Sequence, residues 1–416
     1  RTLPLEGKLL PVANKGEHAS ALIADKQYRF VCAVGILLGT TRWLEFLAVG
    51  IFALDATGSA FLVALLALLR FFPLALFGVF LGALADMLDT TRLFATAIAL
   101  MGTVSLLLAG LFAIGQASYW HVAVATFLAG AFWASDMSLR RKLIGDIAGS
   151  ERLGAAMAFD NAINNGTRLA GPIVAGVLYQ WYGGGGVFLV AGILYLVALC
   201  FALNLRRSVA QDPPDSWILQ PILNAWQAFR YAIADREVLA ILGVTIAFNI
   251  WGFPMFSMVP VIGKLELGLS ASTIGIVSAF QGAAGFIGAL IVARLVKPTQ
   301  YRAIYFYSVC GVISAVFLMG LFPGLAMLGF GVAAAGLAGA GFGSMQGTLI
   351  YRAAPAGMRG RLLGLVTICI GSGLIGFANV GVMADHFGAS NALWIIALEG
   401  AIPMLVIGLT WRNLHR

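Results

Sequence analysis

Long apolar stretches follow one another along most of the chain, separated by short polar connections. Each is about 20 residues or longer, the length that an α-helix needs to cross the hydrocarbon core of a bilayer. The pattern predicts twelve spanning helices, at 29–53, 59–84, 93–114, 119–142, 156–181, 186–204, 238–262, 272–295, 303–322, 324–350, 361–384 and 389–411. The short alternating segments of a membrane β-barrel are not found. The sequence therefore predicts an all-α membrane protein.

The composition agrees with this pattern. Hydrophobic residues make up 60% of the sequence, charged residues 11%, and the mean hydropathy is +0.93. Charged residues form about a quarter of an average soluble domain. The chain is therefore expected to be an integral membrane protein.

Lysine and arginine are unevenly distributed between the two sides of the predicted spans. With a cytoplasmic N-terminus, 22 of the 26 fall in cytoplasmic segments and only Lys264 falls on the other side. The other three, Arg42, Arg70 and Arg168, lie inside spans. Under the positive-inside rule, both termini are expected in the cytoplasm. We interpret the net charge of +8 as a sign of topology and of contact with anionic membrane lipid, and not of nucleic-acid binding.

The longest polar connection divides the chain into six spans and six. It contains the sequence Asp-Pro-Pro-Asp at 212–215, which is typical of a linker, and an amphipathic pattern at 217–231 that suits the membrane surface. We expect a cytoplasmic segment at 1–28, an N-terminal bundle at 29–204, a cytoplasmic linker at 205–237, a C-terminal bundle at 238–411 and a cytoplasmic tail at 412–416.

The two halves share a spacing of glycines. An offset of 205 superimposes Gly166, Gly171, Gly176 and Gly183 on Gly371, Gly376, Gly381 and Gly388. The match falls on the fifth span of each half, where a duplication would place it. We expect the first three glycines of each set, together with Pro172, to let neighbouring helices pack closely.

Short motifs carry a resemblance to a known family. Gly82-Ala83-Leu84-Ala85-Asp86, followed by Arg92, resembles the loop signature of the major facilitator superfamily, although Met87, Asp89 and Thr90 depart from it. Gly171-Pro172 with Gly176 resembles its antiporter motif. Arg168-Leu169 and the stretch 354–361 are most similar to the branch of the enterobactin exporter and related drug-efflux proteins. The resemblance implies two pseudo-symmetric six-helix bundles, a bacterial inner-membrane location and a monomeric transporter.

Charged residues near the ends of spans two, four and eleven form a predicted cytoplasmic gate. Asp86 can accept hydrogen bonds from Arg140 or Arg141 and from the free N–H groups that open span eleven near Arg361. Such contacts would join the two halves and break when the halves separate; an ordinary solvated helix cap is the alternative. The residues assigned to this gate are Gly82, Asp86, Arg92, Asp136, Arg140 and Arg361.

Polar side chains inside the spans mark a predicted site for substrate or proton coupling, because charge is costly to bury in a bilayer. Asp160, Asn164 and Arg168 are spaced i, i+4, i+8 and form one stripe on a helix. Arg42 and Glu45 share a face and could form a structural ion pair with each other; the alternative is that they form a site for the substrate or a proton. The second half offers neutral groups that could equally be interhelical hydrogen bonds. The assigned residues are Arg42, Glu45, Arg70, Asp160, Asn164, Arg168, Asn249 and Gln281; Glu399 is left without a role.

These features favour transport over catalysis. His and Cys form no cluster typical of an enzyme or a metal site, so we expect no catalytic residue, cofactor or metal. A buried carboxylate that gains and loses an arginine neighbour can load and release a proton. We expect a proton-coupled exporter of an amphipathic organic molecule, siderophore-, drug- or metabolite-like. The alternatives are a facilitator or importer of an organic anion, a lipid or lysolipid flippase, and a membrane receptor without transport.

Overall fold

The computed structural model describes residues 22–87, 89–206 and 219–411, except for the side chains of 77–87, 150, 219–222 and 356. The elements of this part are helices. They are α2 Lys26–Thr57, α3 Ala60–Met87, α4 Thr90–Ala113, α5 Tyr119–Ala202, α6 Leu219–Ala234, α7 Arg236–Ala247, η1 Phe248–Gly252, α8 Met255–Val261, η2 Ile262–Glu266, α9 Ala271–Leu295, η3 Pro298–Gln300, α10 Tyr301–Leu321, α11 Leu325–Ala353, η4 Ala356–Met358, α12 Arg359–Gly371, α13 Gly373–Phe387 and α14 Ala389–Thr410.

The twelve predicted spans are found in these helices. Ten segments of the described chain are long and apolar enough to cross a membrane, and one of them, Glu151–Ala202, holds two spans. The described apolar part of α3, Ala60–Leu76, supplies the remaining span. Spans seven and eleven are each assembled from shorter pieces, α7 to η2 and α12 with α13. The prediction of an all-α membrane fold is confirmed.

Helix α5 contains three spans because the chain turns at two glycines. Gly149 has a φ of 68° and Gly183 a φ of 61°, in the left-handed region that residues with a Cβ rarely adopt. Gly388, the partner of Gly183 at the 205 offset, has a φ of 84° at the corresponding end of α13. The last glycine pair of the repeat therefore shares a backbone conformation.

Aspartate caps explain why two helices begin earlier in the structure than the sequence predicted. The Asp89 side chain accepts hydrogen bonds from the backbone N–H groups of Thr91 and Arg92, so α4 begins at Thr90 and not at 93. The Asp235 side chain does the same for Glu237 and Val238, so α7 begins at Arg236 and not at 238. Such caps satisfy N–H groups that would otherwise lack a partner at a helix start.

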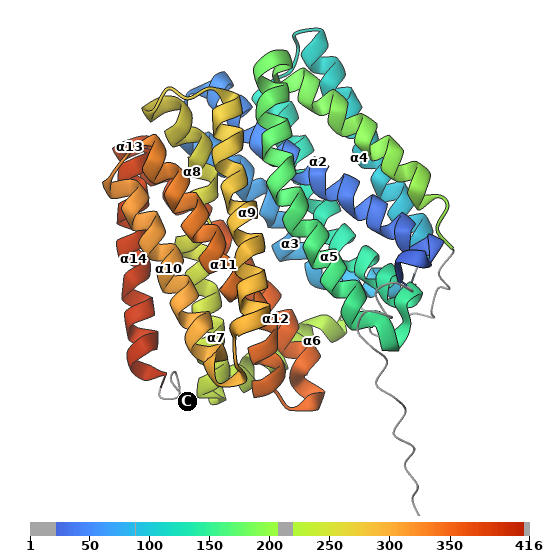
Figure 1. The fold of residues 1–416 in the computed structure, drawn as a ribbon, viewed down its shortest axis with the longest axis vertical. Helices are drawn as coiled ribbons and strands as arrows, with labels where there is room; N and C mark the ends of the chain where they lie inside the picture. The colour runs from blue at the N-terminus through green and yellow to red at the C-terminus, as the bar shows by residue number, and fades with distance from the viewer. Residues whose placement is uncertain (1–21, 88, 207–218, 412–416) are drawn as a thin grey trace, which may run out of the picture.

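The spans form two groups, which we call the N-terminal bundle (α2–α5) and the C-terminal bundle (α7–α14) (Figure 1). Helix α6 and the end of α14 lie at one end of the molecule, here called the linker face (Figure 1). The other end is called the opposite face. Helix α6, Leu219–Ala234, covers most of the amphipathic helix predicted at 217–231. Residues 217 and 218 lie outside the described part.

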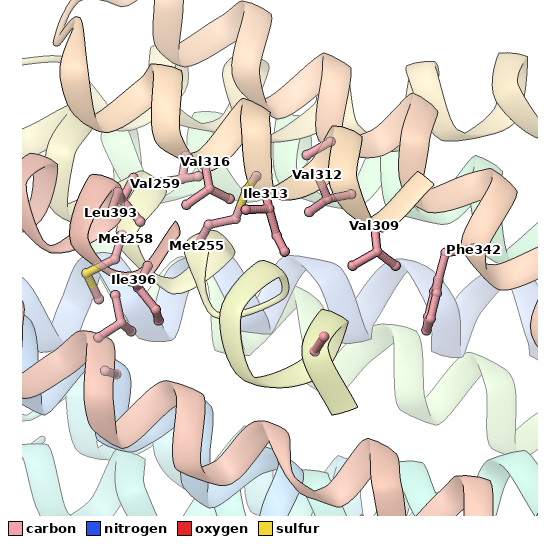
Figure 2. Close-up of a cluster of buried hydrophobic side chains, with 14 of the residues drawn as sticks. Met255, Met258, Val259, Val309, Val312, Ile313, Val316, Phe342, Leu393 and Ile396 are labelled. Atoms are coloured by element: carbon pink, nitrogen blue, oxygen red, sulfur yellow. The ribbon is translucent and has the colours of Figure 1, made fainter. Parts of the chain in front are cut away.

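Each bundle has an apolar interior. In the C-terminal bundle, Met255 of α8 lies beside Ile313 and Val316 of α10, and Met258 lies beside Leu393 and Ile396 of α14 (Figure 2). A separate cluster in the N-terminal bundle includes the fully buried Tyr28, Leu38, Phe94 and Ile98. Burial of such side chains stabilises each bundle as a unit, and the charged residues described below interrupt the interior of the N-terminal bundle.

Polar contacts join the two bundles at the opposite face. The Lys264 ammonium group of η2 pairs with Asp55 of α2. At the start of α3, the Ser59 hydroxyl donates to the Asp385 carboxylate of α13 at 2.9 Å. The Ser272 hydroxyl at the start of α9 donates to Gln180 of α5. Gln180 and Asp385 are related by the 205 offset, so each fifth span binds the start of the other bundle's second span.

Two glycine pairs of the repeat pack in matching ways. A Cβ at Gly171 would lie 3.1 Å from the Thr40 carbonyl oxygen of α2, and one at Gly376 would collide with the Ile250 carbonyl oxygen of η1. Both contacts join the fifth and first spans of the same bundle. A Cβ at Gly176 would lie 2.5 Å from the Ala271 carbonyl oxygen of α9, and one at Gly381 would lie 2.7 Å from Cβ of Ala64 in α3. These contacts join the two bundles.

The remaining pair does not match. A Cβ at Gly371 would lie 2.7 Å from Cβ of Ala75, whereas one at Gly166 would meet no described atom within 4 Å. The open space at Gly166 contradicts the close packing expected there. The carbonyl of Pro172 contacts Gly275 of α9, so this proline lies in the bundle interface.

Candidate functional site

A cavity of about 1120 Å³, opening included, lies between the two bundles. Its polar wall is formed by α5 of the N-terminal bundle and its aromatic wall by the C-terminal bundle. Gln281 of α9 stands between the walls. The polar wall consists of Asn161, Asn164, Asn165 and Arg168, and the aromatic wall of Phe248, Phe253, Phe256 and Phe342.

A second, smaller cavity of about 640 Å³ adjoins the first. The two share Phe256 and Gln281 in their walls. The smaller one is mostly apolar but includes Trp43, Arg70 and Thr126 of the N-terminal bundle. The two cavities are therefore neighbours with a common part of their walls, and together they extend from α5 to α3.

A chain of buried charges crosses the N-terminal bundle. Arg42 of α2 donates to the Asp136 carboxylate at 2.5 Å, and Arg140 Nε donates to the other Asp136 oxygen at 2.9 Å. Arg140 also pairs with Asp160. Because two arginines share Asp136, that carboxylate holds α2 against α5. The pairing of Arg42 with Glu45, considered from their spacing, is not what the structure shows: Arg42 reaches across to Asp136 and stacks on the Trp133 ring at 5.0 Å.

Glu45 has a different and looser set of partners. The Ser105 hydroxyl donates to it at 3.0 Å and the Tyr195 hydroxyl at 3.4 Å. Its nearest arginine is Arg70, whose Nη2 lies 3.8 Å away and also donates to the Arg42 carbonyl oxygen at 3.2 Å. Sequence reasoning missed Ser105 and Tyr195, because a single hydroxyl in an apolar span carries no signal of its own.

The predicted stripe of Asp160, Asn164 and Arg168 is divided between two environments. Asp160 belongs to the buried charge chain, whereas Asn164 and Arg168 line the larger cavity. The Arg168 guanidinium lies 4.5 Å from the centre of the Trp43 ring. Its Nε is buried and has no hydrogen-bond partner among the described residues. Arg168 is thus a cation in the cavity wall that is held by an aromatic ring.

The neutral polar residues of the C-terminal bundle serve different purposes. Gln281, a residue predicted for the site, lines both cavities. Asn249 is buried, and its amide donates to the Thr245 carbonyl oxygen of the preceding turn at 2.8 Å. Gln346 donates to the Thr245 hydroxyl at 3.3 Å. Asn249 and Gln346 are therefore bound within the bundle, outside the lining of the larger cavity.

Glu399, to which the sequence analysis assigned no role, forms hydrogen bonds within the C-terminal bundle. Its carboxylate accepts hydrogen bonds from Trp251 Nε1 at 3.2 Å and from Asn379 Nδ2 at 2.7 Å. These residues belong to spans seven, eleven and twelve. Glu399 thus joins three helices of the C-terminal bundle through two neutral donors.

The comparisons with known proteins identify the family. The profile of the Major Facilitator Superfamily matches residues 31–378. This chain belongs to the major facilitator superfamily. A curated relative, the staphyloferrin A transporter of Staphylococcus aureus (strain NCTC 8325 / PS 47), is 22% identical over 308 residues, which cover 73% of this chain and 72% of the relative.

Solved structures of other transporters share the major facilitator fold. A peptide transporter of the POT family in complex with sulfate superimposes with a TM-score of 0.73 at 13% identity, covering 97% of this chain and 99% of that one. A bacterial homologue of the human lysosomal transporter Spinster, inward-facing and unoccupied, has a TM-score of 0.70 at 16% identity and covers 94% and 98%. A nucleoside transporter has a TM-score of 0.70 at 14% identity and covers 92% and 99%. At these identities the likeness establishes the fold alone.

The residues predicted for the gate of this major facilitator protein are spread over several places. Asp136 and Arg140 lie in the buried charge chain of the N-terminal bundle. Arg92 is exposed and lies 3.3 Å from Asp89, and Arg361 donates to the Met358 sulfur at 3.7 Å. The side chains of the loop signature, including Gly82 and Asp86, lie outside the described residues. Asp136 binds Arg42 and Arg140, and Arg140 also binds Asp160, all within one bundle. The predicted contact between Asp86 and Arg140 or Arg141 involves a side chain outside the described residues and stays a prediction.

Proposed function

We propose that this protein is a proton-coupled secondary transporter that exports an amphipathic organic molecule from the cytoplasm by alternating access. The cavity with a polar wall on one bundle and an aromatic wall on the other carries this proposal. A molecule with a polar head and an apolar body can contact both walls at once. When the bundles rock apart, the walls separate and the bound molecule is exposed to the other side.

The arrangement of the bundles supports alternating access. The contacts of Lys264, Asp385 and Gln180 lie at the opposite face, whereas Asn161 and Ser344 of the cavity lie toward the linker ends of their helices. With both termini in the cytoplasm, as the charge distribution predicts, we infer that this conformation faces inward. Opening to the outside would break the contacts at the opposite face and close the linker face.

Glu45 is our candidate for the proton-carrying residue. Its distance to Arg70 is 3.8 Å, whereas the two arginines on Asp136 lie at 2.5 and 2.9 Å. A proton on Glu45 would remove its attraction to Arg70, which lines the smaller cavity, and would so change the charge that this cavity presents to a substrate. An exporter that exchanges protons for substrate has to bind the two in turn, and the change of charge at Glu45 is our candidate for the switch between them. Coupling of this kind needs only one carboxylate and one shared arginine.

The cargo and direction rest on similarity. The curated relative is described as a transporter of staphyloferrin A, and the Gly171-Pro172 motif resembles that of antiporters. We therefore favour a siderophore-like or related metabolite moved outward. The unpaired Arg168 favours one alternative, a facilitator or importer of an organic anion.

The direction of transport can be tested by comparing the metabolites in the medium of cells with and without the protein. Export predicts a compound that is enriched outside only when the protein is present. The same compound, depleted from the medium by the protein, would instead establish import. No difference for any compound would contradict transport of a soluble metabolite.

Proton coupling can be tested on the enriched compound in reconstituted vesicles. We expect Glu45→Gln to abolish accumulation driven by a pH gradient while exchange of labelled for unlabelled substrate continues, because exchange needs no net proton movement. Glu151→Gln, at an exposed carboxylate on the linker face, is the matched control. Gradient-driven accumulation that survives Glu45→Gln would exclude Glu45 as the proton carrier.

A further inference from the structure

Unsatisfied hydrogen-bond donors gather around the two adjoining cavities. Six buried side-chain polar atoms lack a partner among the described residues. Four of them belong to residues that line the two cavities: Trp43 Nε1, Arg70 Nε, Thr126 Oγ1 and Arg168 Nε. The indole and guanidinium groups can only donate. The site therefore presents donors without acceptors, and a buried donor without an acceptor is costly.

The charges of the N-terminal bundle leave one cation without a carboxylate. Arg42, Arg70 and Arg140 are paired with the three buried carboxylates Glu45, Asp136 and Asp160. Arg168, which lines the cavity, has no carboxylate partner in the described part of the chain. An unpaired charge within a membrane is unfavourable unless it faces water or a ligand of opposite charge.

The setting of Arg168 is suited to hold an anion. The Trp43 ring, 4.5 Å from the guanidinium, fixes the arginine by a cation–π contact and leaves its edge available. Guanidinium N–H groups bind a carboxylate through two parallel hydrogen bonds. The side chain of Gln281, which lines the same cavity from α9, can add an amide donor from the other bundle.

We propose that the cargo is an amphipathic organic anion whose carboxylate binds Arg168 and whose apolar body lies on the aromatic wall. This inference rests on the proposed function and specifies its substrate class. One unpaired cation suits one carboxylate. The apolar body would contact Phe248, Phe256 and Phe342, which line the cavity from the C-terminal bundle. Head and body would thus be held by different bundles.

The phosphodiester of an anionic phospholipid shares the chemistry of the carboxylate. The two sources can be separated by the composition of the bilayer. We therefore place the intact protein in nanodiscs of zwitterionic phosphatidylcholine and, in a second arm, in nanodiscs that also contain phosphatidylglycerol. Binding to empty nanodiscs of each composition is subtracted.

The probes are 2-naphthylacetate and its uncharged analogue 2-(2-naphthyl)ethanol, which share the aromatic body and differ in the carboxylate. In phosphatidylcholine we expect the protein to bind the acid about tenfold more tightly than the alcohol, or more, since hydrogen bonds to charged groups are the stronger ones. Arg168→Gln should lower the affinity for the acid to that for the alcohol, and Arg168→Lys should retain part of the preference. The alcohol affinity of each variant reports whether its cavity is intact. Arg29→Gln removes an exposed arginine at the start of α2 and should change neither affinity.

Equal affinity for acid and alcohol, or an acid preference that survives Arg168→Gln, would overturn the inference and leave the proposed transport untouched. Binding of neither probe would overturn both the inference and the cavity as the binding site. Loss of acid binding in phosphatidylglycerol, with alcohol binding retained, would mean that a lipid head group occupies Arg168. This result would overturn the inference that the cargo carries a carboxylate. Acid binding unchanged by phosphatidylglycerol supports the inference.

Discussion

The contact between Gly176 and α9 offers a direct test of how the bundles move. A Cβ at Gly176 would lie 2.5 Å from the Ala271 carbonyl oxygen, 3.0 Å from Gly275 Cα and 3.1 Å from Ser272 Cα. All three atoms belong to the backbone of the other bundle, so no side chain can rotate away. Gly176→Ala should therefore separate α5 from α9 at the opposite face.

The size of the effect follows from the distances. Ordinary contact begins at 3.4 Å, so the helices must separate by roughly 0.9 Å at this point. Overpacking of this kind costs about 1–3 kcal/mol. If that cost falls only on the conformation described here, the ratio of closed to open opposite faces drops by roughly 5- to 150-fold. Gly166→Ala is the matched control, because the same methyl group on the same helix would meet no described atom within 4 Å.

The assay is a distance measurement between spin labels on the two bundles. Labels at Gln116→Cys and Phe322→Cys, both on connections at the opposite face, report the separation in a background without the native cysteines. Gly176→Ala should add a longer-distance population that Gly166→Ala does not. Identical distance distributions for both variants and the parent would refute the argument that backbone contact at Gly176 holds this face closed.

Two further substitutions test the buried polar networks through thermal stability in detergent. Asp136→Asn leaves two arginines without their shared carboxylate and should destabilise the folded protein by about 3–5 kcal/mol. Adding Arg42→Gln should recover part of this loss. An Asp136→Asn variant as stable as the parent would contradict the role of Asp136 in holding the network together. Glu399→Leu should cost about 1–3 kcal/mol for each of the donors it leaves unpaired, Trp251 and Asn379, whereas Glu399→Gln keeps an acceptor and should cost less. Equal stability of the two Glu399 variants would show that these hydrogen bonds contribute nothing.

Much of the fold could be predicted because lipid imposes one rule on every span. An apolar stretch of sufficient length has to be a helix in the bilayer, whatever its neighbours. Helix starts were less certain: Asp89 and Asp235 act as caps, and a lone aspartate near a span reads equally well as part of a polar loop. A turn between 142 and 156 was predicted from the limits of the spans, but its position at Gly149 was not, because many glycines of this chain lie within helices.

The charged members of the candidate site could be predicted, and their pairings could not. The cost of burying charge singles out Arg42, Glu45 and Arg168 from the sequence alone. Their partners depend on how each helix is rotated about its axis, and Arg42 meets Asp136 from a position 94 residues away. The aromatic wall carried no signal either, because Phe248 and Phe342 look the same in sequence as the other 26 of the chain's 28 phenylalanines.

The division of the cavity into a polar wall and an aromatic wall has a consequence for how such a protein can diversify. The polar wall shares its bundle with the charge chain and Glu45, so most changes there would also disturb folding or coupling. The aromatic wall lies in the other bundle, where the half-buried Glu399 accepts hydrogen bonds from neutral donors. Exchanging Phe248, Phe256 or Phe342 for smaller or larger side chains would reshape the space for the apolar body of the cargo. The residues proposed to bind its head group and to carry the proton would stay the same. New cargoes could thus arise by changes in one half of the chain alone.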